Sequence, residues 1–434
     1  MLHAKQKELN VDSRILTADA VLEYDPMAND APLKVSSDVH WVGVNDGHTD
    51  LFEGLWEIPE GVSYNSYLVI GSEKTALIDS VLKEYQEEHI AKIGQLINPS
   101  LIDYIIINHM EPDHTSSVPK ILEISPNAQV ILTPIALNMF KNFYHAEPRT
   151  IVVKGDNTRV ELGGKTLWFI QTPWLHWPET MSTYLIEEKI LFSCDAFGSF
   201  RQLPHGAIME SDVENKDQYM NGSSKKYFAG VFSGQREWVL KALKKFEDLS
   251  IEPQILAPSH GPAYTIDTRE IMNRWASWSK PVYAKKVVIA FGSMYGMTAK
   301  FVEAIAKGVE EAGGQAKALD LSKTTPVDVL TEMLDAPALM VGCPTYERDL
   351  FPKVKHFLNF LELKKLSDRP VGIFGSFGWS GEASRKLEER LGALGFRLVG
   401  KPLAVLGSPT QEDLERAKTL AKAVAETAFS ERGL

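Results

Sequence analysis

Ten consecutive residues, from Asn108 to Ser117, constrain this chain more than any other stretch. They read N-H-M-E-P-D-H-T-S-S and contain four side chains of the kinds that bind metals in proteins, namely His109, Glu111, Asp113 and His114. The apolar, β-branched run from Leu101 to Ile107 precedes them, as expected for a buried strand that ends in a loop. This density of ligand-type residues at a strand end favours a metal site.

Pro112 divides the stretch into two parts. Because a proline disfavours helical backbone in the residue before it, we expect these residues to lie on stiff, non-helical backbone rather than on a helix face. His109 and Glu111 should then share one side. Asp113 and His114 follow the turn and can serve a second position.

The competing interpretation of this stretch is a solvated turn, in which Thr115 to Ser117 merely cap a helix from Val118 to Ile124. Three distant residues weigh against it, because each follows an apolar run at a point where a strand should end. They are His176 in L-H-W-P, Asp195 in L-F-S-C-D-A-F-G and His260 in A-P-S-H-G-P.

The order of these residues resembles the two-metal site of the metallo-β-lactamase superfamily, and specifically that of the flavodiiron proteins. Hydrolytic members of the superfamily carry H-x-H-x-D-H, and Glu111 stands here at the position of their second histidine. An added anionic oxygen ligand favours iron over zinc and lowers the potential of an iron pair, whereas imidazole-rich sites suit zinc. The substitution therefore indicates redox chemistry in place of hydrolysis.

The resemblance implies an αβ/βα sandwich with two iron ions per chain at one edge, and it makes the metal ligands the catalytic residues. One iron is expected on His109, Glu111 and His176. The other is expected on Asp113, His114 and His260, with Asp195 bridging the two. The implied substrate is a diatomic gas, either dioxygen reduced to water or nitric oxide reduced to nitrous oxide.

Composition limits the partners that this chain can have. Its 434 residues are 44% hydrophobic and carry a formal net charge of -11, which suffices for two or three globular cores. An acidic balance argues against a nucleic-acid partner, since such a partner needs clustered lysine and arginine. No apolar stretch is long enough to cross a bilayer and none follows the first residues as in a signal peptide, so we expect a cytoplasmic protein without a membrane partner.

The cysteine count bears on the electron donor. The chain has two cysteines, Cys194 and Cys343, which lie far apart and most simply serve as small core residues. An iron–sulfur cluster or a built-in rubredoxin needs four thiolates. The electron donor is therefore expected to be a separate partner, such as a rubredoxin or a reduced cofactor.

Three parts of the chain differ in their patterns. Residues 1–36 are polar and form a predicted N-terminal extension. Residues 37–283 alternate short strands with helices, and include a hairpin of Tyr67–Ile70 and Thr75–Asp79, so they predict an α/β layered domain that holds the metals. Residues 284–434 form a further predicted domain, which opens with a buried strand from Lys285 to Phe291.

A glycine-containing loop follows this strand and reads Gly292-Ser293-Met294-Tyr295-Gly296-Met297-Thr298, with an amphipathic helix after it. Backbone N–H groups and hydroxyls at such a turn can bind a phosphate, which the helix dipole favours. Alone, the loop could equally serve to shape the backbone. Two more strand-end loops accompany it, at Pro344–Tyr346 and Ser376–Gly381. In a doubly wound parallel sheet such loops meet at the topological switch point, where a ligand binds.

The pattern S-x-Y-G-x-T at Ser293 to Thr298, together with the two later loops, resembles flavodoxin, a family that binds FMN. The resemblance implies that the first loop holds the phosphate and that the other two surround the flavin. The implied cofactor-binding residues are Ser293, Met294, Tyr295, Gly296, Met297, Thr298, Pro344, Thr345, Tyr346, Ser376, Phe377, Gly378, Trp379, Ser380 and Gly381.

A metal domain followed by a flavodoxin-like domain is the order of a minimal flavodiiron protein. The resemblance implies a head-to-tail homodimer, or a dimer of such dimers, in which the flavin of one chain faces the irons of the other. Two other functions stay open, a zinc-dependent hydrolase of the metallo-β-lactamase type with an accessory flavodoxin domain, and a non-enzymatic electron carrier. Glu111 argues against the first, and retention of all seven ligand-type residues argues against the second.

Overall fold

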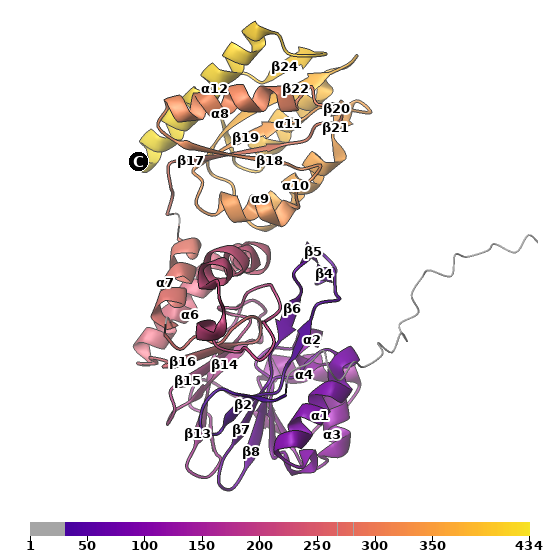
Figure 1. Cartoon of the computed structure of the whole chain (residues 1–434), viewed down its shortest axis with the longest axis vertical. Helices are drawn as coiled ribbons and strands as arrows, with labels where there is room; N and C mark the ends of the chain where they lie inside the picture. The colour runs from indigo at the N-terminus through magenta and orange to yellow at the C-terminus, as the bar shows by residue number, and fades with distance from the viewer. Residues whose placement is uncertain (1–30, 267, 281) are drawn as a thin grey trace, which may run out of the picture.

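The computed structural model describes residues 31–266, 268–280 and 282–434, and it arranges them in two α/β bodies, one above the other in Figure 1. The first body is a sandwich of two sheets with helices on its outer faces, and the second is a mostly parallel sheet between two layers of helices. These are the predicted αβ/βα sandwich and doubly wound sheet, so the predicted fold class is confirmed. No helix within the described residues is long and apolar enough to cross a membrane.

The first sheet of the sandwich has seven strands, in the order β1-β2-β7-β8-β9-β10-β11. In β9, Tyr104 and Ile106 face the other sheet, whereas Ile105 faces the outer helices. Both faces are therefore buried, which explains the unbroken apolar run in the sequence. The strands are β1 (Leu33–Lys34), β2 (Val39–Trp41), β7 (Tyr67–Ile70), β8 (Thr75–Ile78), β9 (Tyr104–Ile106), β10 (Gln129–Leu132) and β11 (Thr150–Val152).

The second sheet has five strands in sequence order, β12 (Arg159–Glu161), β13 (Thr166–Gln171), β14 (Met181–Leu185), β15 (Ile190–Cys194) and β16 (Ile255–Pro258). Its β15 and β16 are parallel, so both end at the same edge. Two small hairpins lie beside the sheets, β3 (Val44–Asp46) with β6 (Val62–Tyr64), and β4 (Leu51–Phe52) with β5 (Trp56–Glu57).

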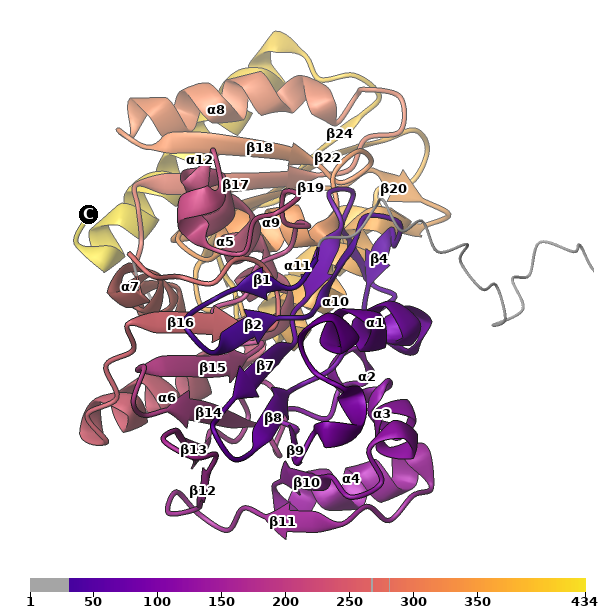
Figure 2. The same ribbon diagram turned by 60° about the horizontal axis from the view of Figure 1, so that its bottom comes forward.

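Helices cover the sandwich on both sides, as Figures 1 and 2 show. Against the first sheet lie α1 (Gln86–Leu96), α3 (Val118–Ile124) and α4 (Pro134–Tyr144), with the single turn α2 (Pro112–Thr115) beside them. Against the second lie α6 (Arg236–Asp248) and α7 (Thr268–Ser279). Between β15 and α6, the short α5 (Ser224–Tyr227) lies between two π-helical turns, Gln218–Ser223 and Phe228–Phe232. Such π-helical turns often occur at functional sites.

The second body is built on a six-stranded sheet. Five of its strands follow the order β18-β17-β19-β22-β23, and the sixth, β24, also pairs with β22. All of these pairs are parallel, and helices cover both faces (Figure 1). The strands are β17 (Lys286–Phe291), β18 (Gln315–Asp320), β19 (Ala338–Gly342), β22 (Pro370–Phe377), β23 (Arg397–Leu398) and β24 (Leu403–Leu406), with a hairpin of β20 (Thr345–Tyr346) and β21 (Asp349–Leu350). The helices are α8 (Val302–Glu311), α9 (Pro326–Met333), α10 (Pro352–Leu363), α11 (Glu382–Ala393) and α12 (Gln411–Arg432).

Comparison with the expected elements confirms the hairpin, which β7 and β8 form as an antiparallel pair. The expectation of a non-helical ligand loop was partly wrong, because α2 places Asp113 and His114 on a helical turn. Pro112 keeps the backbone of Glu111 extended, with a ψ of 142°. Proline is also well suited to the first position of a helix, where its missing N–H is not needed, so α2 begins at Pro112. The predicted extension, residues 1–36, lies mostly outside the described residues, and its end contributes β1 to the first sheet.

The segment around α5 also joins the two bodies. Lys225 and Lys226 form ion pairs with Asp335 and Asp328 across the junction, at 3.0 and 2.9 Å. Between them and α6, Gly230 packs so closely that a Cβ there would lie 3.3 Å from Val327 of α9. The same short segment therefore contacts α9 of the second body and, as described below, the metal cluster of the first.

These ion pairs predict a pH dependence of stability. Burial raises the pKa of Asp328, but the Lys226 ammonium outweighs it and holds this pKa below its ordinary value of 3.8. A carboxyl with a lowered folded pKa stabilises the fold fully above its unfolded pKa, and this contribution is lost as the pH falls through the folded value. We expect Lys226→Gln to lower the free energy of unfolding at pH 7 by at most about 1 kcal/mol, and by less below about pH 4.

Thermal unfolding of the wild type and the variant at pH 7 and at pH 3 measures this difference. Lys244→Gln is the matched control, because Lys244 is an exposed lysine that pairs with Asp248 in its own helix and not across the junction. A Lys226→Gln deficit that is equally large at both pH values would contradict the prediction.

Candidate metal centre

The seven predicted ligand residues come together at one edge of the sandwich, where strands of both sheets end. His109 lies three residues beyond β9 and Asp195 directly follows β15. His260 follows β16 by two residues, so the parallel pair β15 and β16 carries it to the same edge as Asp195. His176 was predicted to follow directly after a strand, and this prediction is wrong. It lies on the loop between β13 and β14.

One set of ligand-type atoms comes from His109, Glu111, His176 and Asp195, and these atoms all lie within 4.8 Å of one another. Glu111 Oε2 is 3.2 Å from Nε2 of His109 and 3.2 Å from Nε2 of His176. Asp195 Oδ2 lies 3.4 and 3.0 Å from the same two nitrogens. Ligands about 2.1 Å from a shared ion stand about 3 Å apart when they are at right angles, so these spacings suit a bound metal.

A second set comes from Asp113, His114 and His260. Asp113 lies 3.3 Å from His114 Nε2 and 3.4 Å from His260 Nε2. Asp195 Oδ1 lies 2.9 and 3.2 Å from the same nitrogens. The two oxygens of Asp195 thus face different sets, which is the arrangement that a bridging carboxylate requires.

The second set also contains polar atoms that the protein alone does not satisfy. Nε2 of His114, Nε2 of His260 and Oδ1 of Asp113 are buried, and within the described part of the chain they make no hydrogen bond of acceptable geometry, although they lie close to carboxylates and imidazoles. A buried polar group without a partner costs about 1–3 kcal/mol. A cation coordinated by these atoms removes that cost, so the residues fit a metal ion at this position.

Electrostatics within the cluster keep the carboxylates ionised. Burial raises the pKa of Asp195, but His114, His176 and His260 around it hold this pKa well below its usual range. Burial alone would lower the pKa of His260, but the carboxylates of Asp113 and Asp195 outweigh this effect and raise its pKa to about 10. The ionised carboxylates therefore favour a positive charge beside them, which either the histidine protons or a bound cation can supply.

Aromatic rings enclose the cluster. Phe52 lies edge-on to His260, with ring centroids 5.2 Å apart, and Tyr227 lies 5.7 Å from the same ring. Phe232 packs against His176 at 5.4 Å. Since Tyr227 and Phe232 come from α5 and the π-helical turn after it, the segment that contacts α9 also forms the wall of the metal site. These rings cover His260 and His176 and limit the access of water to them.

Cys194 also lies near the cluster, within reach of His114 and Asp195. Burial raises the pKa of its thiol far above the ordinary value, so it stays protonated and is a poor metal ligand. It accordingly behaves as a small core residue.

Two carboxylates that support the cluster were not identified in the sequence. Glu179 Oε1 lies 2.6 Å from His109 Nδ1 and accepts a hydrogen bond from the Met110 N–H at 3.0 Å. Asp79 accepts two hydrogen bonds from Asn108, from its N–H at 2.8 Å and its amide at 2.9 Å, and burial raises the pKa of Asp79 to about 6. Both residues end or follow motifs visible in the sequence, T-A-L-I-D and H-W-P-E, but no spacing connects them with the ligand stretch.

The predicted flavin-binding residues lie at the carboxyl ends of β17, β19 and β22. Thr298 Oγ1 lies 3.0 Å from Ser376 Oγ, so the first loop contacts the end of β22. Large apolar side chains are unusually exposed there, with Tyr295 at 88% and Trp379 at 74% of their maximal exposure, and Tyr346 and Met294 nearby. An exposed group of this kind marks a ligand-binding or interaction surface, and a flat aromatic cofactor fits it. Ser376 and Phe377 belong to β22 itself, not to the loop after it.

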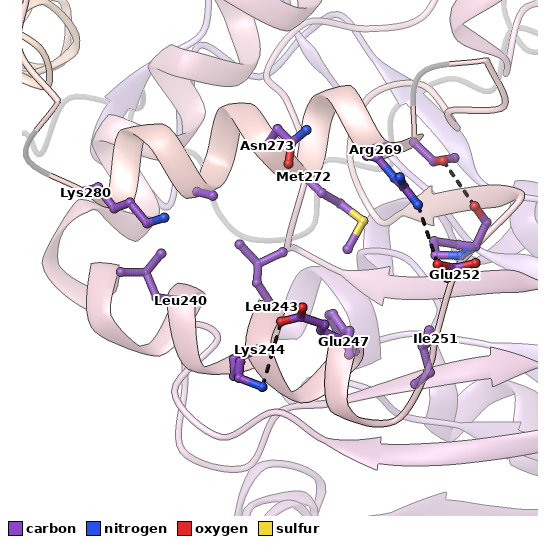
Figure 3. A pocket seen from close by; sticks show the side chains of 14 residues that line it. Leu240, Leu243, Lys244, Glu247, Ile251, Glu252, Arg269, Met272, Asn273 and Lys280 are labelled. Atoms are coloured by element: carbon purple, nitrogen blue, oxygen red, sulfur yellow. Dashed lines mark hydrogen bonds and ion pairs between the residues drawn. The ribbon is translucent and has the colours of Figure 1, made fainter.

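A separate cleft of about 650 Å³ lies between α6 and α7 (Figure 3). Leu243 and Met272 project into it, and ion pairs of Lys244 with Glu247 and of Arg269 with Glu252 lie at its rim. None of the seven ligand-type residues lines it, so the reactive site is not at this cleft.

Two families match the chain in the predicted order. Residues 62–261 match the ODP family beta lactamase and residues 289–428 match flavodoxin. A protein named nitric oxide reductase, from Moorella thermoacetica, is 34% identical over 401 residues, which are 91% of this chain and 98% of that one. A rubredoxin-oxygen oxidoreductase from Megalodesulfovibrio gigas is 29% identical and covers 90% of this chain and 97% of its own length.

Solved structures give the same result. The rubredoxin oxygen:oxidoreductase from Desulfovibrio gigas superimposes with a TM-score of 0.87 at 28% identity, covering 93% of this chain and all of the other. The flavodiiron protein from Giardia intestinalis also gives a TM-score of 0.87 at 28% identity, covering 92% of this chain and 97% of the other. With the metal-type cluster and the flavodoxin fold in one chain, these relatives show that the chain belongs to the flavodiiron, or type A flavoprotein, family.

Proposed function

We propose that this protein is an oxidoreductase that reduces dioxygen to water, nitric oxide to nitrous oxide, or both, at a non-haem diiron site supplied with electrons through FMN. One observation carries the proposal. Two sets of ligand atoms face the two oxygens of one carboxylate, Asp195, and the first set contains Glu111 in place of an imidazole. A shared carboxylate between two open sites suits a pair of metals that bind one small molecule, and the added carboxylate suits iron.

The roles of the residues follow from their positions. His109, Glu111 and His176 would hold one iron, and Asp113, His114 and His260 the other, with Asp195 between them. When bound, the iron pair supplies the redox-active centre at which the gas is reduced. The protein fixes the separation of the two positions through Asp195, and it keeps bulk water away through Phe52, Tyr227 and Phe232.

Electron supply involves the second body. FMN would lie on the loops at Gly292–Thr298, Pro344–Tyr346 and Ser376–Gly381, where exposed aromatic side chains gather. The cofactor can take up electrons in pairs and release them singly. The name of the Megalodesulfovibrio relative includes rubredoxin as its partner, and two buried cysteines are too few to form such a centre within this chain. We therefore propose a separate donor, either a rubredoxin or a reduced cofactor.

Metal analysis combined with an absorption spectrum and anaerobic turnover tests the proposal. We expect about two irons and one FMN per chain, and consumption of dioxygen or nitric oxide by the chemically reduced protein. Parallel assays with each gas decide which is preferred, since the metal ligands are common to both reactions. Zinc in place of iron would instead support the hydrolase, and flavin without metal the electron carrier.

We further propose that the active unit is a homodimer or dimer of dimers. The flavin loops and the metal cluster belong to different bodies of one chain, joined by a short segment around Ala284. Head-to-tail pairing under twofold symmetry would place one chain's flavin beside the partner's metals. We expect gel filtration at assay concentrations to give the mass of a dimer or larger species. A fully active monomer would contradict this proposal.

A further inference from the structure

The histidines of the metal cluster differ in what their outward ring nitrogens meet. Nδ1 of His260 lies 2.7 Å from the backbone carbonyl of Ser63, and Nδ1 of His114 is buried without a hydrogen bond. Nδ1 of His109 instead lies 2.6 Å from a carboxylate oxygen of Glu179, and both of these side chains are fully buried. Of these three histidines, His109 is thus the one whose outward nitrogen meets a charged group among the described residues.

The surroundings of Glu179 settle which atom of His109 points to the metal. Glu179 Oε1 accepts the N–H of Met110, and an ionised carboxylate can only accept, so the proton of the short contact is assigned to His109 Nδ1. The lone pair of His109 is then on Nε2, which lies 3.2 Å from Glu111 Oε2 and 3.4 Å from Asp195 Oδ2. The carboxylate therefore holds the ring in the tautomer and orientation that ligation needs.

Glu179 also makes the charge of the two metal positions unequal. Apart from the shared Asp195, each position has one carboxylate of its own, Glu111 in the first and Asp113 in the second. The charge of Glu179 acts more strongly on the first position than on the second, because it is directly hydrogen-bonded to the ring of His109. Interactions between charges are strong where water is excluded. A metal at the first position is therefore bound by a more basic imidazole and a more negative environment.

We propose that Glu179 is a positioning residue that fixes Nε2 of His109 as a ligand atom and makes the iron at the His109 position the more tightly held and the harder to reduce of the two. The inference rests on the proposed diiron function. In a half-reduced pair, the added electron would then reside at the position of Asp113, His114 and His260.

Glu179→Gln in the full-length, flavin-loaded protein tests this role. Glutamine keeps nearly the same shape and an oxygen that can accept from Nδ1, but it removes the charge. We expect the affinity of the first position for metal to fall about 10–100-fold, measured as iron retained against increasing chelator. Removing the negative charge should weaken the binding of ferric iron more than that of ferrous iron. In a redox titration followed by electron paramagnetic resonance, the two reduction steps should then move closer together, because the potential of the second step rises by about 59 mV for each tenfold fall in the ratio of ferric to ferrous affinity.

Two further variants separate this role from simple support of the loop. Thr133→Val removes the 2.9 Å hydrogen bond from the Thr133 hydroxyl to the backbone carbonyl of Glu179 and leaves the carboxylate in place. We expect it to lower the melting temperature without bringing the two reduction steps together. Glu179→Asp retains the charge, so it should restore most of the separation. If Glu179→Gln did not fold, a narrowed separation of the two reduction steps in both Glu179→Asp and Thr133→Val, which keep the carboxylate, would overturn the proposal.

The result can be distinguished from failure of the proposed function. If the wild type carries zinc, the diiron function fails, yet the chelator titration on zinc-loaded protein still tests the effect of Glu179 on metal affinity. With iron bound in the wild type, equal iron retention and an unchanged separation of the two steps in Glu179→Gln would overturn the inference while leaving the diiron function in place.

Discussion

Asp195→Asn protein is expected to purify with FMN bound but with less than its full iron, and to reduce neither dioxygen nor nitric oxide. Asparagine has nearly the shape of aspartate but lacks the charge that partly neutralises two adjacent cations. Asp195 is 1% exposed, and its two oxygens face the two ligand sets at 2.9 to 3.4 Å. An amide offers one oxygen and a nitrogen that cannot coordinate, so one set loses its share of the bridge.

The alternative is that Asp195 only accepts hydrogen bonds, as from the Ser259 hydroxyl at 3.0 Å. In that case the variant would lose at most about 1–3 kcal/mol of stability and keep its activity. Asp103→Asn is the matched control, because Asp103 accepts a hydrogen bond from the Thr75 N–H at 2.8 Å and lies beside a strand without facing the cluster. Iron and FMN per chain are measured together with gas consumption. Full iron and undiminished turnover in Asp195→Asn would remove the bridging role.

Glu111→His is expected to shift the protein from iron towards zinc and to abolish gas reduction. The variant carries H-x-H-x-D-H, the pattern of the hydrolytic members of the superfamily. Glu111 Oε2 stands 3.2 Å from both His109 Nε2 and His176 Nε2, so an imidazole at this position would replace the one anionic oxygen that the first set does not share. Loss of that charge disfavours ferric iron, and an imidazole-rich set suits zinc.

Metal analysis of the variant grown with equal iron and zinc, followed by assays with each gas, measures the change. Glu123→His is the control, since Glu123 lies on α3 with its side chain 70% exposed, and its ion pair within the described residues is with Lys120. We expect this control to keep the metal content and turnover of the wild type. A Glu111→His protein that retains its iron and reduces gas at the wild-type rate would show that Glu111 does not select the metal.

Several elements of the fold could be predicted from local patterns in the sequence. The hairpin of β7 and β8 could be predicted because a turn and two alternating runs are neighbours in the chain. The strand β9 could be predicted because a strand buried on both faces leaves an unbroken apolar run. The turn α2 was missed because the same proline that keeps Glu111 extended also starts a helix, and one residue cannot indicate which effect extends further along the chain.

Some residues of the metal site could also be predicted from the sequence, and others could not. The ligand types and their order, with Glu111 among them, can be read from the sequence. The division into two sets on a shared aspartate was implied by the resemblance to the flavodiiron proteins that this order carries. Glu179 was not predictable, because it contacts His109 across 70 residues of chain and lies on a loop between two other strands. Tyr227 and Phe232 were not predicted for a related reason, since α5 and the π-helical turn after it, which place these two rings, have no recognised pattern in the sequence.

The sequence by itself therefore determined which chemical groups are present, namely seven ligand-type residues, a flavodoxin-like loop and their order along the chain. Only the tertiary structure decided which atoms meet: the two oxygens of Asp195 with different sets, and Glu179 with His109 alone. The physical reason is that the packing of the two sheets fixes these contacts. That packing is stabilised by many apolar side chains, and apolar residues of similar volume can replace one another there with little loss of stability. The local sequence therefore does not indicate which polar side chains the packing brings together.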